Sequence, residues 1–165
     1  MKTLLFGYGN VDRQDDGVAW HILRALMSRF NLPLPEDLDV EYHDPINQLD
    51  FVFQLQLTPE IASDLIGFDR VCFIDAHTGA IPDDIHFENV KPSFQKSPFT
   101  HHLTASSLLS ITETLFQKFP ETILVSVRGF DFGFSRSLSN STAILSEQAA
   151  DLIANWIKEE QKPQN

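Results

Sequence analysis

The chain opens with MKTLLFGYGNVDRQDDG, residues 1–17, and this stretch organises the fold expected for the rest of the chain. Thr3 to Phe6 form a short apolar run that ends at a glycine, which is typical of a buried strand. Glycines punctuate the loop that follows, and Asp15 and Asp16 stand where a helix should begin. A strand, a loop and an acidic helix start often carry a functional site at the carboxyl edge of a parallel sheet.

The same loop lacks the glycine pattern of a dinucleotide-binding site. Gly7 and Gly9 supply the first two glycines, but Asp12 stands where the third is required. A pyrophosphate would also face three carboxylates here, and poorly solvated like charges at short range repel strongly. One carboxylate of the pair Asp15 and Asp16 is expected to cap the helix, which leaves the other free.

Length and composition predict a single domain over residues 1–165, with a frayed polar tail at about 159–165. The formal net charge of −11 argues against a nucleic-acid partner, because such a partner requires a surface rich in Lys and Arg. No stretch is long and apolar enough to span a membrane, and the N-terminus lacks the features of a signal peptide. Cys72 is the only cysteine and lies in an apolar run, so we expect a core residue, a reducing compartment and a cytoplasmic protein.

Apolar residues recur with strand and helix periods in alternation along the chain. Further strands are expected at 38–42, 51–57, 70–75, 83–90 and 122–127, and helices at 16–30, 58–67, from Thr104 to Phe116, and from Ser139 onward. Such alternation predicts an α/β fold, in which a mostly parallel central sheet lies between two helical layers as a three-layer α/β/α sandwich.

Three candidate positions fall at one kind of place in this framework. Asp16 follows the first strand, Asp75 closes the most apolar strand, and His101 and His102 precede a helix. Because the carboxyl ends of parallel strands share one edge of the sheet, these side chains are expected to converge. Two carboxylates and an imidazole suit a borderline divalent metal such as nickel or zinc. Each residue also has a structural explanation on its own, and His77 competes as a ligand.

Other catalytic motifs are absent from the sequence. It contains no Gly-x-Ser-x-Gly elbow, no His-Glu-x-x-His helix and no phosphate-binding loop of the Walker type. The serines of residues 135–146 flank a helix start, which is typical of turn and cap residues.

Several segments, in the right order along the chain, carry a family resemblance. They are Gly7–Asn10 with Asp15–Gly17, Val71–Ala76, Thr100–Thr104 before the pair Leu108–Leu109, and, more weakly, Val125–Ser139. These segments resemble the hydrogenase maturation endopeptidases, which process the large subunit of [NiFe] hydrogenases. The resemblance implies a three-layer α/β/α domain, in agreement with the periodicity.

The resemblance also implies catalytic, metal-contacting positions at Asp16, Asp75 and His101, and it leaves Gly9, Asn10 and His102 as residues that support the site or the substrate. Counting back from the Leu108–Leu109 pair selects His101 rather than His102. Family members commonly have Glu at the position of Asp16, and Asp keeps the carboxylate on a shorter side chain.

The activity implied by the resemblance is removal of the C-terminal extension from a nickel-loaded hydrogenase large-subunit precursor. The nickel belongs to the substrate, with zinc or another divalent ion as a substitute. Two alternatives stay open at this point. One is a nickel-binding accessory or scaffold protein of hydrogenase assembly without cleavage activity. The other is an enzyme similar to peptidyl-tRNA hydrolase, whose early loop also contains Gly-Asn but which the acidic charge disfavours.

Overall fold

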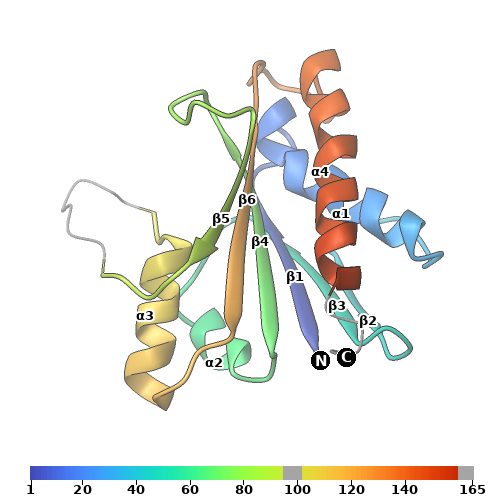
Figure 1. Cartoon of the computed structure of the whole chain (residues 1–165). Coiled ribbons are helices and arrows are strands. Elements are labelled where there is room, and N and C mark those ends of the chain that lie inside the picture. Colours follow the sequence, from blue (N-terminus) through green and yellow to red (C-terminus); the bar gives the residue numbers. More distant parts are fainter. Residues whose placement is uncertain (95–101, 160–165) are drawn as a thin grey trace.

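A six-stranded mixed sheet forms the centre of the molecule, in the order β2-β3-β1-β4-β6-β5 (Figure 1). The computed structural model describes residues 1–94 and 102–159. The strands are β1 (Thr3–Tyr8), β2 (Glu41–Asp44), β3 (Leu49–Gln54), β4 (Arg70–His77), β5 (Ile85–Val90) and β6 (Glu121–Arg128). The four central strands are parallel, and the edge strands β2 and β5 run antiparallel to their neighbours.

Helices cover both faces of the sheet and complete three layers (Figure 1). One layer contains α1 (Val18–Arg29) and α4 (Asn140–Glu159), and the other contains α2 (Ile61–Leu65) and α3 (Ala105–Phe116). A short 3-10 helix, η1 (Gln14–Gly17), precedes α1. The predicted α/β/α sandwich with a mostly parallel sheet is therefore confirmed.

Each face of the sheet has its own core, because successive side chains of a strand point to opposite faces. On β1, Leu5 belongs to the cluster under α1 and α4, whereas Leu4 and Phe6 belong to the cluster under α2 and α3. Cys72 is fully buried in the first cluster, as predicted for a core residue. Burial raises the pKa of its thiol far above the usual range, so Cys72 acts as a small apolar side chain.

Two helix starts expected from capping residues are confirmed, whereas the helix expected at 58–67 begins at Ile61 and has no side-chain cap. Thr104 is the N-cap of α3, and its hydroxyl oxygen accepts a hydrogen bond from Ser107 N at 3.1 Å. Ser139 directly precedes α4 and accepts from Thr142 N at 3.3 Å. Capping side chains of this kind satisfy backbone N–H groups that have no partner in the first turn of a helix.

The register of the β2–β3 hairpin differs from the prediction. The strands expected at 38–42 and 51–57 lie instead at 41–44 and 49–54. The cause is Asp44, whose buried carboxylate closes the turn by accepting from Ile46 N at 3.0 Å and from Asn47 Nδ2 at 2.6 Å. Because β3 ends before residue 55, Leu55 is 64 % exposed rather than packed in the core.

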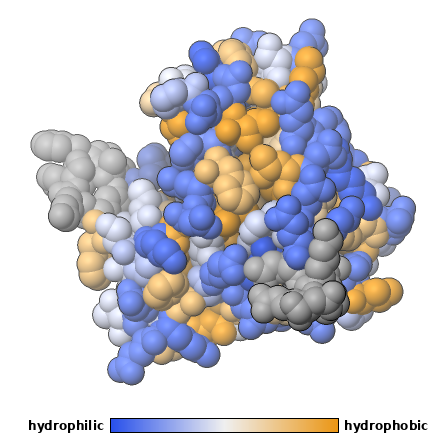
Figure 2. Space-filling model, viewed as in Figure 1, coloured by the Kyte–Doolittle hydropathy of each residue, from blue (hydrophilic) through white to orange (hydrophobic). Residues whose placement is uncertain are grey.

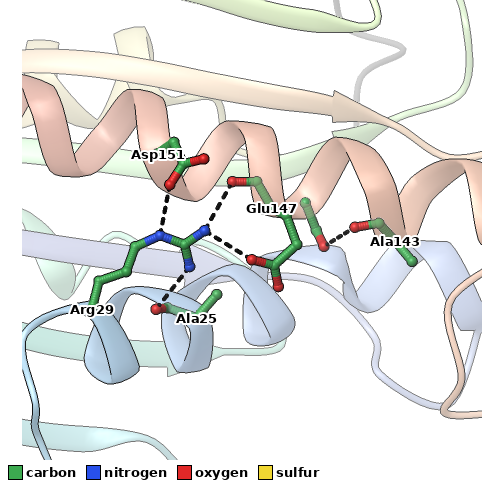
Figure 3. Close-up of polar contacts among 6 residues, drawn as sticks. Ala25, Arg29, Ala143, Glu147 and Asp151 are labelled. Carbon is green, nitrogen blue, oxygen red and sulfur yellow. Dashed lines mark hydrogen bonds and ion pairs between the residues drawn. The ribbon is translucent and has the colours of Figure 1, made fainter.

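An ion-pair cluster joins the two helices of the first layer (Figure 3). Arg29 of α1 donates to Glu147 Oε2 at 2.8 Å and to Asp151 Oδ1 at 2.9 Å on α4, and it also donates to the carbonyl oxygen of Ala25. Both carboxylates are largely exposed, so each pair stabilises the fold by only about 0–1 kcal/mol. The cluster orients α1 against α4, while the apolar core supplies most of the stability.

The surface combines charged and apolar residues, and Figure 2 shows both kinds interspersed on one face. Phe134 is 96 % exposed and Phe130 is 43 % exposed. No helix within residues 1–94 and 102–159 has the length and apolar character that a membrane crossing requires. Of the tail expected at 159–165, only Glu159 is described, and it ends α4.

Candidate active site

The loop after β1 brings Asp16 back toward the end of that strand. Asp16 Oδ2 accepts a hydrogen bond from Asn10 N at 2.9 Å, and Asn10 Oδ1 accepts one from Asp12 N at 3.0 Å. Asn10 therefore shapes the turn with its side chain and contacts Asp16 with its backbone. These bonds hold the Asp16 carboxylate at the carboxyl edge of the sheet.

Gly9 makes this close approach possible. Its φ of +147° lies in a region that favours glycine, and a Cβ atom there would lie 2.1 Å from the backbone oxygen of Asp16. A side chain at position 9 would therefore push η1 away from β1.

We expect Gly9→Ala to displace Asp16 and to lower both stability and any activity that depends on Asp16. The expected loss of stability is about 2–3 kcal/mol, from backbone strain together with the steric conflict. Thermal melting of the purified variant measures it. Gly67→Ala is the matched control, because its nearest atom lies at 3.4 Å and its φ is not in the strained range. Equal melting temperatures for the two variants would contradict this role of Gly9.

Asp15 is a structural residue and not a cap of its own helix. The expectation that Asp15 or Asp16 caps α1 is wrong, because the N-cap position of α1 is Gly17 and no side chain caps it. Asp15 is fully buried and reaches across to the segment before α4, where it accepts from the backbone N–H groups of Phe130, Asp131 and Ser139. It also accepts from the hydroxyls of Ser139 and Thr142.

These hydrogen bonds decide the charge state of Asp15. Burial alone raises the pKa of a carboxyl, but the bonds from Asp131, Phe130 and Ser139 outweigh burial and lower the pKa of Asp15 to about 2. Asp15 is therefore a buried anion that ties the loop before α1 to the start of α4, which fixes the neighbouring Asp16 from the other side.

Asp75 lies on β4, next to the end of β1. The strand continues to His77, so Asp75 is not its last residue as the sequence suggested. The Tyr8 hydroxyl donates to Asp75 Oδ2 at 2.9 Å. The other oxygen, Oδ1, is buried and has no partner at hydrogen-bond distance among the described residues.

The surroundings of Asp75 raise its pKa above the ordinary value of a carboxyl. Burial raises its pKa and the nearby charge of Asp16 adds to that effect, while Ser126, Tyr8 and His77 oppose it. Burial, together with the charge and hydrogen bond of Asp75, also raises the pKa of Tyr8 well above its usual value. The Tyr8 hydroxyl therefore keeps its proton and remains a donor.

Asp16 and Asp75 line one cleft at the carboxyl edge of the sheet. The cleft has a volume of about 990 Å³, and its lining includes Tyr8, Gly9, Asn10, Arg13, His102 and Thr104. The predicted supporting residues Gly9, Asn10 and His102 thus all reach it. A cleft of this volume lies within the range that ligand-binding sites commonly have.

Two candidate histidines, His101 and His77, are not among the described residues that line this cleft. His101 lies outside the described residues, so its predicted role stays a prediction. Within residues 1–94 and 102–159, no group of three His, Cys, Asp or Glu side chains is arranged to hold a metal ion. His77 is occupied in a turn, where its Nε2 contacts the carbonyl oxygen of Asp83 at 2.9 Å and its Nδ1 accepts from Gly79 N at 3.1 Å.

Sequence reasoning missed two residues of this region, Tyr8 and Asp15. Tyr8 stands between two glycines, and its position one residue beyond the apolar run could have indicated a side chain at the strand end. The buried role of Asp15 has no local signal, because its hydrogen-bond partners lie more than a hundred residues further along the chain.

Comparisons with known proteins identify the fold. No protein-family model matches the chain, and no curated protein matches it in sequence. Hydrogenase maturating endopeptidase HybD from E. coli shares 17 % identity at a TM-score of 0.73, over 97 % of this chain and 94 % of that one. The [NiFe] hydrogenase maturation protease HycI from Thermococcus kodakarensis KOD1 shares 17 % identity at a TM-score of 0.65, over 95 % and 92 %. Hydrogenase 2 maturation peptidase from the Thaumarchaeota archaeon SCGC_AB-539-E09 shares 18 % identity at a TM-score of 0.63, over 96 % of this chain and 99 % of that one.

The chain therefore has the α/β fold of the hydrogenase maturation endopeptidases along nearly its whole length. This agrees with the family resemblance in the sequence, which rests on the loop of Asp16, the strand of Asp75 and the helix start after His102.

Proposed function

We propose that this protein is a hydrogenase maturation endopeptidase that removes the C-terminal extension of a nickel-loaded [NiFe] hydrogenase large-subunit precursor. The observation that carries the proposal is the placement of Asp16 and Asp75 on one cleft at the carboxyl edge of the sheet. The shared fold and the matching sequence segments support the same activity. The precursor is its partner, and the cytoplasm is where the reaction would take place.

In this proposal, nickel is part of the substrate and the cleft recognises it. Asp16, Asp75 and His101 contact nickel that the precursor already holds, so a loaded precursor gains contacts that an empty one lacks. Differential binding of this kind couples cleavage to correct loading. Nickel beside the scissile peptide supplies Lewis-acid chemistry, which polarises the carbonyl group or a water molecule.

The test is incubation of the purified chain with nickel-loaded and with nickel-free precursor, followed by mass spectrometry of the product. Cleavage of the loaded precursor alone supports the proposal. Cleavage of both forms would contradict nickel recognition. Binding of the loaded precursor without cleavage would identify a scaffold protein of hydrogenase assembly.

We expect the isolated chain to bind Ni²⁺ or Zn²⁺ weakly. Two carboxylates and one imidazole make an incomplete site for these metals in the absence of the thiolates of the substrate. Isothermal titration calorimetry of the purified chain measures the affinity. Tight binding that survives replacement of Asp16, Asp75 and His101 together would contradict the assignment.

The choice between the two adjacent histidines has its own prediction. We expect His101→Ala to reduce cleavage of the loaded precursor by about a hundredfold or more. Altering a residue that only orients a metal ligand costs about 10–100-fold, and loss of the ligand itself should cost more. His102→Ala is the matched control and should have a mild effect, although His102 lines the cleft. The reverse pattern, measured as kcat/KM, would assign the contact to His102.

A further inference from the structure

We propose that Tyr8 is a positioning residue for Asp75. Its hydroxyl donates a hydrogen bond to Oδ2 of the carboxylate, and this bond fixes the orientation in which the carboxylate meets the metal of the substrate. The inference rests on the proposed function and adds to it a residue outside the predicted site.

The sheet places the two residues side by side. Gly7 of β1 pairs with Ile74 of β4 in parallel register, so Tyr8 lies next to Asp75 one residue further along. Both side chains line the cleft, and the hydroxyl donates to Asp75 Oδ2 at 2.9 Å. The hydrogen bond therefore joins the end of β1 to the adjacent strand β4 at the cleft.

The ring of Tyr8 is fixed by the core, which gives its hydroxyl a defined direction. Tyr8 packs against the apolar cluster under α2 and α3, and its ring centroid lies 6.5 Å from that of Phe6. Phe6 in turn contacts Phe73 edge to face at 5.8 Å. A rigid aromatic side chain with a single polar atom at its tip can hold an acceptor in place at little cost in conformational entropy.

The two oxygens of Asp75 have different surroundings. Oδ2 accepts from Tyr8, whereas Oδ1 is buried and has no partner at hydrogen-bond distance among residues 1–94 and 102–159. Ser126, which pairs with Asp75 on β6, is another side chain that stabilises the carboxylate. Carboxylates that contact metals are commonly oriented by a hydrogen bond from a second residue, and Tyr8 supplies that bond here.

Tyr8→Phe removes only the hydroxyl, and Tyr42→Phe is a matched control. Tyr42 is the only other tyrosine of the sequence, and it lies on the edge strand β2 rather than at the cleft. Ni²⁺ is titrated calorimetrically into the wild-type chain, both variants and Asp75→Asn. We expect Tyr8→Phe to weaken nickel binding by about 10–100-fold, and Tyr42→Phe to bind as the wild type does.

Cleavage of the nickel-loaded precursor provides the second readout. We expect Tyr8→Phe to lower kcat by about tenfold or more with little change in KM, because Asp75 is misaligned while the peptide-binding cleft persists. If the hydroxyl were purely structural, its loss would lower the melting temperature but would not lower kcat selectively at constant KM.

The outcomes separate the inference from the proposed function. Nickel affinity and kcat of Tyr8→Phe equal to those of the wild type would overturn the inference and leave the proposed function standing. If Tyr8→Phe binds nickel more weakly than the wild type but the wild type cleaves no precursor, the positioning role is supported and the proposed protease activity is contradicted. A wild-type chain that neither binds nickel nor cleaves the precursor would overturn both.

Discussion

Replacement of Asp16 by Asn is expected to abolish cleavage of the nickel-loaded precursor while the fold remains intact. The change keeps the size and one acceptor oxygen, so the hydrogen bond from Asn10 N can persist. The substitution removes no helix cap, because no side chain caps α1. What it removes is the negative charge that attracts a metal cation, and we expect cleavage to fall by at least about a hundredfold.

The measurement is kcat/KM for nickel-loaded precursor, with circular dichroism to confirm folding. Asp12→Asn is the matched control, since Asp12 lies in the same loop but its carboxylate pairs with Arg136 at 2.7 Å and does not line the cleft. The control should cleave at close to the wild-type rate. Full activity of a folded Asp16→Asn protein would remove the central carboxylate from the proposed mechanism.

The second large effect is expected at Asp15, and it concerns stability. Asp15 accepts five hydrogen bonds while fully buried. An Asn side chain has the same shape but only one acceptor oxygen, and its amide N–H groups would face donors of the segment before α4. We expect Asp15→Asn to cost about 3 kcal/mol, or about 6–12 °C in melting temperature for a domain of this size.

Thermal melting of the wild type and of Asp15→Asn at pH 7 tests this expectation. Asp131→Asn is the control, because Asp131 is exposed and contributes its backbone, not its carboxylate, to the contact with Asp15. A melting temperature of Asp15→Asn within about 2 °C of the wild type, a range typical of surface changes, would contradict the buried-anion role.

The lowered pKa of Asp15 predicts that the stability of the fold depends on pH. The pKa of Asp15 is about 2 in the folded chain against an ordinary value of 3.8, so the ionised form is favoured by folding. This contributes about 2 kcal/mol of stability that is fully present above pH 3.8 and is lost as the pH falls toward 2. The stability difference between wild type and Asp15→Asn, measured by urea unfolding, should therefore shrink over this range.

Much of the architecture is determined by the local sequence. Hydrophobic periods of two and 3.6 residues place most strands and helices, because each element must bury one face. Thr104 and Ser139 mark helix starts through hydrogen bonds that span three residues. Once strands and helices alternate, the rules for parallel sheets bring Asp16 and Asp75 to the same edge, so their shared cleft could be predicted without coordinates.

Tertiary structure decided the roles of side chains whose partners are distant in sequence. Asp15 and Asp16 are adjacent and chemically identical, yet one is a buried anion bound to the start of α4 and the other lines the cleft. Tyr8 meets Asp75 across 67 residues, through the register of β1 and β4. A periodic pattern records which face of an element is apolar, but it does not record which polar groups meet when two elements pack. That pairing depends on strand register and loop geometry, which only the folded chain defines.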